Sequence, residues 1–295
     1  MLNPAPAARQ SPRRYSRLTL AICRCVEVLC ALMGGRWFYR ARFLRSGRFH
    51  VRAETISVPG LPPGLEGLRI AHLSDLHGGH FMRAGDLRDV VEEINRREVD
   101  LCVLTGDFIS HHWRDALPLA ADLGRISSRF GTLAVFGNHD YRERQEARIA
   151  ESFEAGGVRF LRNECARFDT GAGILAVTGL EDLEEGKRID PAAARAQMRA
   201  GDIELMLCHN PHGAAALARP ECVAILSGHT HGTQLNLPYL RRFGPPHPGE
   251  RLQCGTTAVI VNRGLGVVAV PLRFRSPAEV VLVTLHRGDP GEAER

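Results

Sequence analysis

The feature that most constrains this chain is the segment Gly228-His229-Thr230-His231-Gly232, which directly follows the apolar run Val223–Leu226. Alternate residues of an extended backbone point to the same side, so His229 and His231 would leave the end of a strand together. The flanking glycines would allow close approach of the backbone. A His-x-His pair is weak evidence by itself. It gains weight here because nitrogen and oxygen donors also follow four other apolar runs.

Beyond residue 52, strand-like segments alternate with segments of helical spacing. Apolar residues at helical spacing predict helices over 87–97, 116–126 and 144–155. The predicted strands are 54–58, 68–73, 101–105, 131–136, 158–168, 174–178, 203–207, 223–226, 259–262, 266–270 and 280–285. Residues 158–168 and 174–178 are expected to form a hairpin. Strands and helices alternate first, and the chain that follows is rich in strands. This order favours an α/β fold in which two or more sheets pack together with helices on their outer faces.

Side chains that bind metal ions follow these predicted strands. They are two carboxylates, one amide and four imidazoles: Asp75, Asp107, Asn138, His77, His209, His229 and His231. Strand ends at one edge of a sheet are where open α/β folds bind ligands. Seven such ligands exceed what one tetrahedral zinc ion uses, so the set favours two ions. Manganese, iron, zinc or cobalt suits this mixture of donors.

Five ordered blocks resemble the calcineurin-like metallophosphoesterases: Asp75-x-His77, Gly106-Asp107, Gly137-Asn138-His139-Asp140, His209 and Gly228-His229-x-His231. The flanking segments 60–70 and 262–266 are similar to the bacterial phosphodiesterase branch of that family. The resemblance implies a four-layer sandwich, two packed mixed β-sheets flanked by helices, formed by residues 53–295.

The resemblance also implies a role for each residue. Asp75, His77 and His231 would hold one divalent ion, Asn138, His209 and His229 would hold a second, and Asp107 would bridge both. Phosphodiester or pyrophosphate bonds would then be hydrolysed by a hydroxide shared between the ions, with His139 as electrophile or general acid. Two alternatives stay open: a lipid-precursor pyrophosphatase of the UDP-diacylglucosamine type, and a catalytically silent scaffold with the same fold.

One position departs from the family pattern. Many members carry a second carboxylate three residues after the bridging aspartate, and this chain has Ser110 there. A hydroxyl stabilises an imidazolium less than a carboxylate does. We therefore expect a lowered pKa for His139 and a preference for good leaving groups, such as aryl phosphates or pyrophosphate.

Residues 1–52 form a basic arm with eleven arginines and one acid, Glu27. The net charge of the arm is +10, whereas that of the whole chain is +5, so residues 53–295 have a net charge of −5. A net negative charge disfavours nucleic-acid binding by this part of the chain, the body. Residues 18–34 predict an amphipathic N-terminal helix, interrupted by Arg24 and Glu27. Two charges at its centre disfavour a spanning helix. The flanking arginines and the aromatic run 37–39 favour a helix lying on a membrane, on its cytoplasmic face.

Two other interpretations of the arm are open. Arg13-Arg14 before the apolar run resembles a twin-arginine export signal, although no Ala-x-Ala cleavage site follows. Alternatively, the helix packs its apolar side on the body. The eight cysteines contain no Cys-x-x-Cys pair and several lie in apolar runs, which indicates reduced thiols in a reducing compartment.

The remaining polar candidates are expected to have ordinary roles. His80, His111 and His112 are interpreted as solvated loop histidines, and residues 181–185 as a solvated acidic loop. Arg263 is equally compatible with a contact to substrate phosphate and with a structural hydrogen bond. The expected partners are a phosphoester substrate, either a small molecule or lipid-linked, and a membrane surface.

Overall fold

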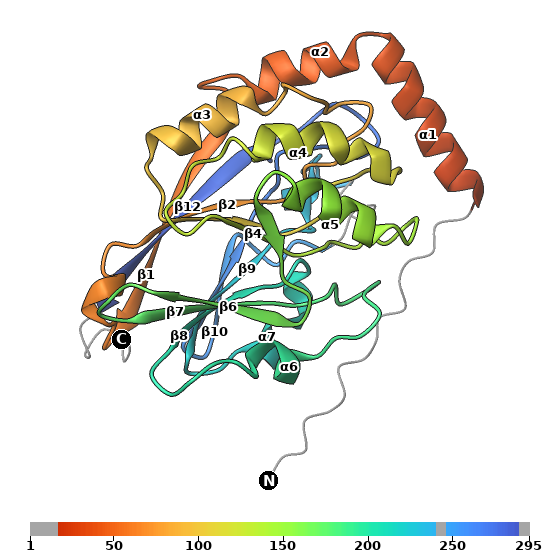
Figure 1. Cartoon of the computed structure of the whole chain (residues 1–295). Coiled ribbons are helices and arrows are strands. Elements are labelled where there is room, and N and C mark those ends of the chain that lie inside the picture. Colours follow the sequence, from red (N-terminus) through yellow and green to blue (C-terminus); the bar gives the residue numbers. More distant parts are fainter. Residues whose placement is uncertain (1–16, 240–245, 289–295) are drawn as a thin grey trace.

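The computed structural model describes residues 17–239 and 246–288, with side chains from residue 21 onward. Two six-stranded sheets pack face to face, and helices cover their outer faces (Figure 1). The arrangement is the sandwich of two mixed sheets that the sequence predicts. The arginine pair at residues 13 and 14 lies outside the described residues, so its interpretation as an export signal stays a prediction.

The first sheet has the strand order β1-β12-β2-β3-β4-β5. Its neighbours pair in parallel, except that β12 runs antiparallel to β2. The strands are β1 (His50–Pro59), β12 (Glu279–Gly288), β2 (Arg69–Leu73), β3 (Leu101–Leu104), β4 (Thr132–Ala134) and β5 (Val158–Phe160). The helices predicted around 87–97, 116–126 and 144–155 cover this sheet as α3 (Arg88–Arg96), α4 (Leu117–Leu123) and α5 (Glu146–Glu154) (Figure 1).

The second sheet has the order β10-β11-β9-β8-β7-β6, antiparallel at its two edge pairs and parallel between. Its strands are β6 (Glu164–Asp169), β7 (Ile174–Gly179), β8 (Ile203–Leu207), β9 (Cys222–Ser227), β10 (Arg251–Cys254) and β11 (Thr257–Val261). Two short helices, α6 (Pro191–Arg195) and α7 (Ala214–Leu217), lie beside it (Figure 1). Short 3-10 turns occur at Pro63–Leu65, Trp113–Asp115, Pro211–Gly213 and His231–Thr233.

Three apolar clusters follow from this layering. Ile70 and Val103 from the first sheet and Leu205 and Leu226 from the second belong to the cluster between the sheets. Alternate residues of the same strands point outward to the helices, as Ala71 and Cys102 do. Because β3 and β9 are covered on both faces, their sequences are nearly continuous apolar runs rather than alternating ones. β8 is interrupted by Glu204, which is buried and pairs with Arg195.

The prediction of one strand over 158–168 is wrong. This run holds two strands that belong to different sheets, because β5 ends at Phe160 and β6 begins at Glu164. The chain crosses from one layer to the other in between, where Asn163 adopts a left-handed φ of 57°. Leu161 packs between the two sheets during the crossing, so the apolar pattern continues through the break.

The prediction of a strand at 266–270 is also wrong, because side chains take the place of a neighbouring strand. The side-chain amide of Gln234 donates to the carbonyls of Val268 and Val270, and its oxygen accepts from the N–H of Val268. The N–H of Ala269 donates to the carboxylate of Glu27 over 3.0 Å. Polar side chains distant in sequence satisfy this backbone, and local periodicity carries no sign of them.

The N-terminal helix is present as α1 (Arg17–Leu32), followed by α2 (Gly35–Tyr39) and a π-helical turn over Arg40–Leu44. The helix α1 does not pack its apolar side on the body, contrary to one interpretation of the sequence; its apolar side faces outward. Glu27 is 3% exposed and faces the body, whereas Ile22, Leu29 and Met33 are more than half exposed. Among the described helices, none has the length and apolar character needed to cross a membrane.

The segment after α1 packs into the body before residue 53. Tyr39, Phe43 and Leu44 belong to the core beneath the first sheet, and the Tyr39 hydroxyl donates to the carbonyl of Leu265 over 2.5 Å. The predicted division at residue 52 therefore falls inside β1, which begins at His50. All eight cysteines are free thiols.

Candidate metal centre

The predicted ligands all lie just beyond the carboxyl ends of strands, from both sheets. Asp75 and His77 follow β2, Asp107 follows β3, and Asn138 follows β4; His209, His229 and His231 follow β8 and β9. Hydrogen bonds tie the loops of the two sheets together, as where the N–H of His229 donates to the Asp75 carboxylate over 3.0 Å. The packing of the sheets therefore brings residues far apart in sequence to one edge.

Five of these seven residues have a left-handed backbone. The φ angles are 51° at Asp75, 49° at His77, 56° at Asp107, 70° at His229 and 51° at His231. Each costs about 1–2 kcal/mol relative to ordinary backbone, and such strain concentrates at functional sites. Hydrogen bonds between the loops hold it in place: Asp75 N–H donates to Gly106 O over 2.9 Å, and His77 N–H to Asp107 O over 3.0 Å.

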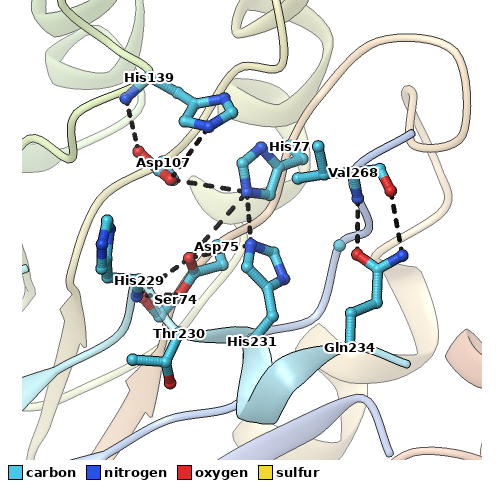
Figure 2. Close-up of polar contacts among 12 residues, drawn as sticks. Ser74, Asp75, His77, Asp107, His139, His229, Thr230, His231, Gln234 and Val268 are labelled. Atoms are coloured by element: carbon cyan, nitrogen blue, oxygen red, sulfur yellow. Dashed lines mark hydrogen bonds and ion pairs between the residues drawn. The ribbon is translucent and has the colours of Figure 1, made fainter. Parts of the chain in front are cut away.

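One half of the site is a buried cluster of Asp75, His77, Asp107 and His231, whose ligand atoms all lie within 4.8 Å of one another (Figure 2). His77 Nε2 lies 2.9 Å from His231 Nε2 and 3.6 Å from Asp107 Oδ2, and His231 Nε2 lies 3.3 Å from Asp75 Oδ1. Two carboxylates and two imidazole nitrogens that converge in this way suit a divalent cation.

The other half lies on the opposite side of Asp107. His209 Nδ1 is 2.5 Å from the carbonyl of Thr105, which can only accept, so Nδ1 carries the proton. His209 Nε2 is buried, has no hydrogen-bond partner in the described structure, and lies 3.4 Å from Asp107 Oδ2. His229 Nδ1 lies 3.0 Å from Asn138 Oδ1, and the His209 and His229 rings are 5.2 Å apart. A buried imidazole nitrogen that faces a carboxylate oxygen across 3.4 Å fits a second cation bound between them.

Glycines leave room for the two carboxylates. A Cβ at Gly137 would lie 2.3 Å from Asp107 Oδ1, and one at Gly228 would lie 2.3 Å from Asp75 Oδ2. Both distances are far below any real contact, so a side chain at either position would displace a candidate ligand. The close backbone approach expected of Gly228 is therefore observed.

The electrostatics of the cluster favour the binding of cations. Burial and the neighbouring charge of Asp107 raise the pKa of Asp75 to about 6. Burial lowers the pKa of His77 to about 4 and that of His229 to about 3. Burial opposes the protonated form of His209, but Asp107 more than offsets this and raises its pKa. Divalent cations would stabilise both carboxylates and keep the imidazoles neutral.

His139 lies beside Asp107, to which its N–H donates over 2.8 Å, with Nε2 4.0 Å from Asp107 Oδ2 (Figure 2). Its pKa is lowered, with burial as the main cause and the charge of Arg142 adding to it. Arg142 Nη2 donates to His139 Nε2 over 2.8 Å, and Nη1 donates to the carbonyl of Ser110 over 2.8 Å. The Ser110 hydroxyl instead donates to the carbonyl of His77.

Asp140, which was given no role from sequence, joins two of the ligand loops. Its buried carboxylate accepts from the N–H groups of Gly137, Asp107 and Phe108 at 2.8–3.0 Å. It thereby fixes the backbone N–H groups of Asp107 and Phe108. Its position at the end of the Gly-Asn-His-Asp block was the available signal.

The acidic run at 181–185 is solvated only in its second half, where Glu184 and Glu185 are exposed. Glu181 and Asp182 are buried, and Tyr141 and Arg162 donate to Glu181. Glu184 lies 3.5 Å from His229 Nε2 and accepts from Asn210 over 2.8 Å. These contacts form because the run follows the end of β7 beside the metal cluster. The charge pattern of the run does not indicate that position.

Two other candidates are resolved by their partners. Arg263 has a structural role, because its guanidinium donates to the buried carboxylate of Glu279. His111 is not solvated: its side chain is 14% exposed, and its Nε2 lies 2.6 Å from Glu27. His112 is exposed and pairs with Glu143.

A family model described as calcineurin-like phosphoesterase matches residues 68–233. The chain therefore belongs to the calcineurin-like phosphoesterase family, as the sequence blocks predict. It is 31% identical over 268 residues to the uncharacterized metallophosphoesterase YkuE of Bacillus subtilis, covering 86% of this chain and 92% of that protein.

Other relatives differ in length. An uncharacterized metallophosphoesterase of Aquifex aeolicus is 27% identical, over 87% of this chain and 97% of its own length. A Danio rerio protein named transmembrane protein with metallophosphoesterase domain is 29% identical, over 78% of this chain. The chain spans 56% of that protein, so the two are alike over only part of its length.

Proposed function

We propose that this protein is a two-metal phosphoesterase that hydrolyses phosphodiester or pyrophosphate bonds. The observation that carries the proposal is the position of Asp107, 3.6 Å from His77 on one side and 3.4 Å from His209 on the other. Two bound divalent cations would supply Lewis-acid activation of water and neutralise charge on the phosphate. Asp75, His77 and His231 would hold one cation; Asn138, His209 and His229 would hold the other.

The residues beside this cluster supply the remaining functions. His139 and Arg142 lie together next to Asp107, where a guanidinium can bind phosphate oxygens and an imidazole can donate to the leaving oxygen. The neutral Ser110 in place of a carboxylate leaves Arg142 free to approach His139, which favours substrates with good leaving groups. A catalytically silent scaffold is disfavoured, because all seven candidate metal ligands and His139 are present.

A substrate panel tests the proposal. Full-length protein, chelated and then supplied with manganese, is expected to hydrolyse bis-(p-nitrophenyl) phosphate much faster than p-nitrophenyl phosphate. A nucleotide-sugar lipid is the third substrate, and preference for it would select the lipid-precursor pyrophosphatase. Hydrolysis of the monoester alone would contradict a diesterase. No activity on any of the three would favour a scaffold.

We also propose that the arm binds the surface of a membrane. Most of the exposed large apolar side chains lie on or next to α1 and α2 and on the loop after β11: Ile22, Val26, Val28, Leu29, Leu32, Met33, Trp37, Phe38, Leu272 and Phe274. The arginines of residues 1–52 other than the buried Arg52 add attraction to anionic lipid. The transmembrane names of the Danio rerio and Bos taurus relatives are consistent with a membrane setting.

Sedimentation with phospholipid vesicles measures membrane binding and tests this second proposal. Replacing Leu29 and Trp37 by serine is expected to weaken binding to phosphatidylcholine vesicles containing phosphatidylglycerol by about tenfold or more, because each side chain contributes about 1.5–3 kcal/mol of apolar burial. Ile189→Ser is the matched control, since Ile189 is 42% exposed and lies two residues before the start of α6. Figure 1 shows α6 far from α1. Equal loss in both variants, or none in the first, would contradict docking through the arm.

A further inference from the structure

A cavity of about 180 Å³ lies between α1 and two of the loops that carry candidate metal ligands. Its wall combines one side of the helix with the segments that follow His77 and Asp107, and includes Arg24, Val28, His80, Arg83, His111 and Asp115. None of these residues belongs to the metal cluster. His80 is three positions beyond the ligand His77, so the cavity adjoins the cluster without being part of it.

The wall carries surplus positive charge. Within the described part of the chain, Arg24 and Arg83 have no carboxylate partner, whereas Arg36 and Arg40 nearby both pair with Asp86. Arg83 donates through Nε to the carbonyl of Gly79, which leaves its charge uncompensated. Two permanently charged guanidiniums around a concave space, against the single carboxylate of Asp115, favour an anion. Guanidinium groups match phosphate and carboxylate oxygens in geometry as well as charge.

A buried carboxylate fixes α1 at this place. Glu27 lies three residues after Arg24, on the same side of the helix. One of its oxygens is 2.6 Å from His111 Nε2, and the other accepts from the N–H of Ala269 over 3.0 Å. Glu27 thus joins the helix to the loop after β3 and to the loop after β11, and the latter is held by Gln234, three residues from His231. The native packing therefore sets the position of Arg24.

We propose that this cavity is a subsite for a second phosphate-type anion of the substrate, held by Arg24 and Arg83. The inference rests on the proposed phosphoesterase function, since the reacting phosphate would lie at the adjoining metal cluster. The anion is either a further phosphate on a soluble diester or the headgroup phosphate of a lipid. The exposed apolar side of α1 next to the cavity suits the second source.

Calorimetric titration of inorganic phosphate into chelated full-length protein tests the subsite without using activity. We expect binding by the wild type and about tenfold weaker binding by Arg24→Gln and by Arg83→Gln, the loss typical of a charge-assisted contact. Arg159→Gln is the matched control, because Arg159 is exposed on β5 and makes the same charge change away from the cavity. Wild-type affinity in both test variants, or no binding by the wild type, would overturn the proposal.

Two soluble diesters then assign the anion to the substrate. The p-nitrophenyl ester of thymidine 5′-phosphate and its analogue with an added 3′-phosphate share the reacting bond. The manganese-supplied wild type is expected to favour the analogue in kcat/KM by about tenfold, and Arg24→Gln and Arg83→Gln are expected to lose that preference while they hydrolyse the simple ester normally. If neither ester is hydrolysed, the proposed function fails while the calorimetry still decides the subsite.

A vesicle-binding measurement separates the two sources of the anion. Equal hydrolysis of both esters by the wild type, together with loss of phosphatidylglycerol vesicle binding in Arg24→Gln, would exclude the soluble diester and assign the two arginines to a lipid headgroup phosphate. Equal hydrolysis with unchanged vesicle binding would overturn the substrate assignment. Preference for the added phosphate, with vesicle binding unchanged in Arg24→Gln, supports a substrate subsite.

Discussion

Asp107→Asn is expected to reduce kcat/KM for an aryl phosphodiester by about 10³-fold or more. The carboxylate of Asp107 lies 3.6 Å from His77 in one half of the cluster and 3.4 Å from His209 in the other, so the amide would weaken both cation sites at once. Metal catalysis of this kind contributes several kcal/mol to transition-state stabilisation, and each 1.36 kcal/mol is a tenfold change in rate. The measurement is steady-state kinetics with manganese added to chelated protein.

Asp169→Asn is the matched control for this variant. Asp169 lies in the exposed hairpin turn between β6 and β7, where its side chain accepts from the N–H of Gly171, as an asparagine oxygen also can. It should retain wild-type activity. Retention of more than about a tenth of the activity by Asp107→Asn would contradict the bridging role.

The second large effect is on stability. Glu279 is fully buried and accepts from the guanidiniums of Arg52 and Arg263, which are themselves 9% exposed. Glu279→Gln would remove the fully buried counter-charge that Arg52 and Arg263 share and leave them only Glu54 and the more exposed Glu250, a change that costs about 3–5 kcal/mol. The expected fall in Tm is about 10 °C, measured by thermal denaturation followed by circular dichroism. Glu250→Gln removes a 42%-exposed partner of the same Arg263 and should change Tm far less.

This stabilisation also depends on pH. Burial raises the pKa of Glu279, but Arg52 and Arg263 more than offset that effect and bring it below the usual 4.5. A carboxylate whose folded-state pKa is depressed stabilises the fold fully above the unfolded value and loses the effect as pH falls. The difference in Tm between wild type and Glu279→Gln should therefore be largest near neutral pH and shrink below pH 4.5. A difference that does not vary with pH would contradict the ion-pair explanation.

The candidate metal centre was predictable because its signals are local in sequence. Each ligand directly follows an apolar strand, and glycines stand where Asp107 and Asp75 need room. The two-layer sheet arrangement followed from the same alternation of strands and helices. Burial of both faces of β3 and β9 also made those strands easy to find as nearly continuous apolar runs.

The errors arose where long-range contacts decide the structure. Residues 158–168 divide between two sheets although their apolar pattern is continuous, and residues 266–270 are held by Gln234 and Glu27 rather than by a strand. The direction in which α1 faces was set by one buried carboxylate, Glu27, and its partner His111. Periodicity identified the amphipathic helix, but which side packs on the body depends on contacts 84 positions away.

The most direct test of the account is anomalous diffraction from crystals of the full-length protein grown with manganese. We predict two manganese peaks roughly 3.5–4 Å apart, with the carboxylate of Asp107 contacting both. A single peak, or two peaks that Asp107 does not join, would contradict the two-metal centre.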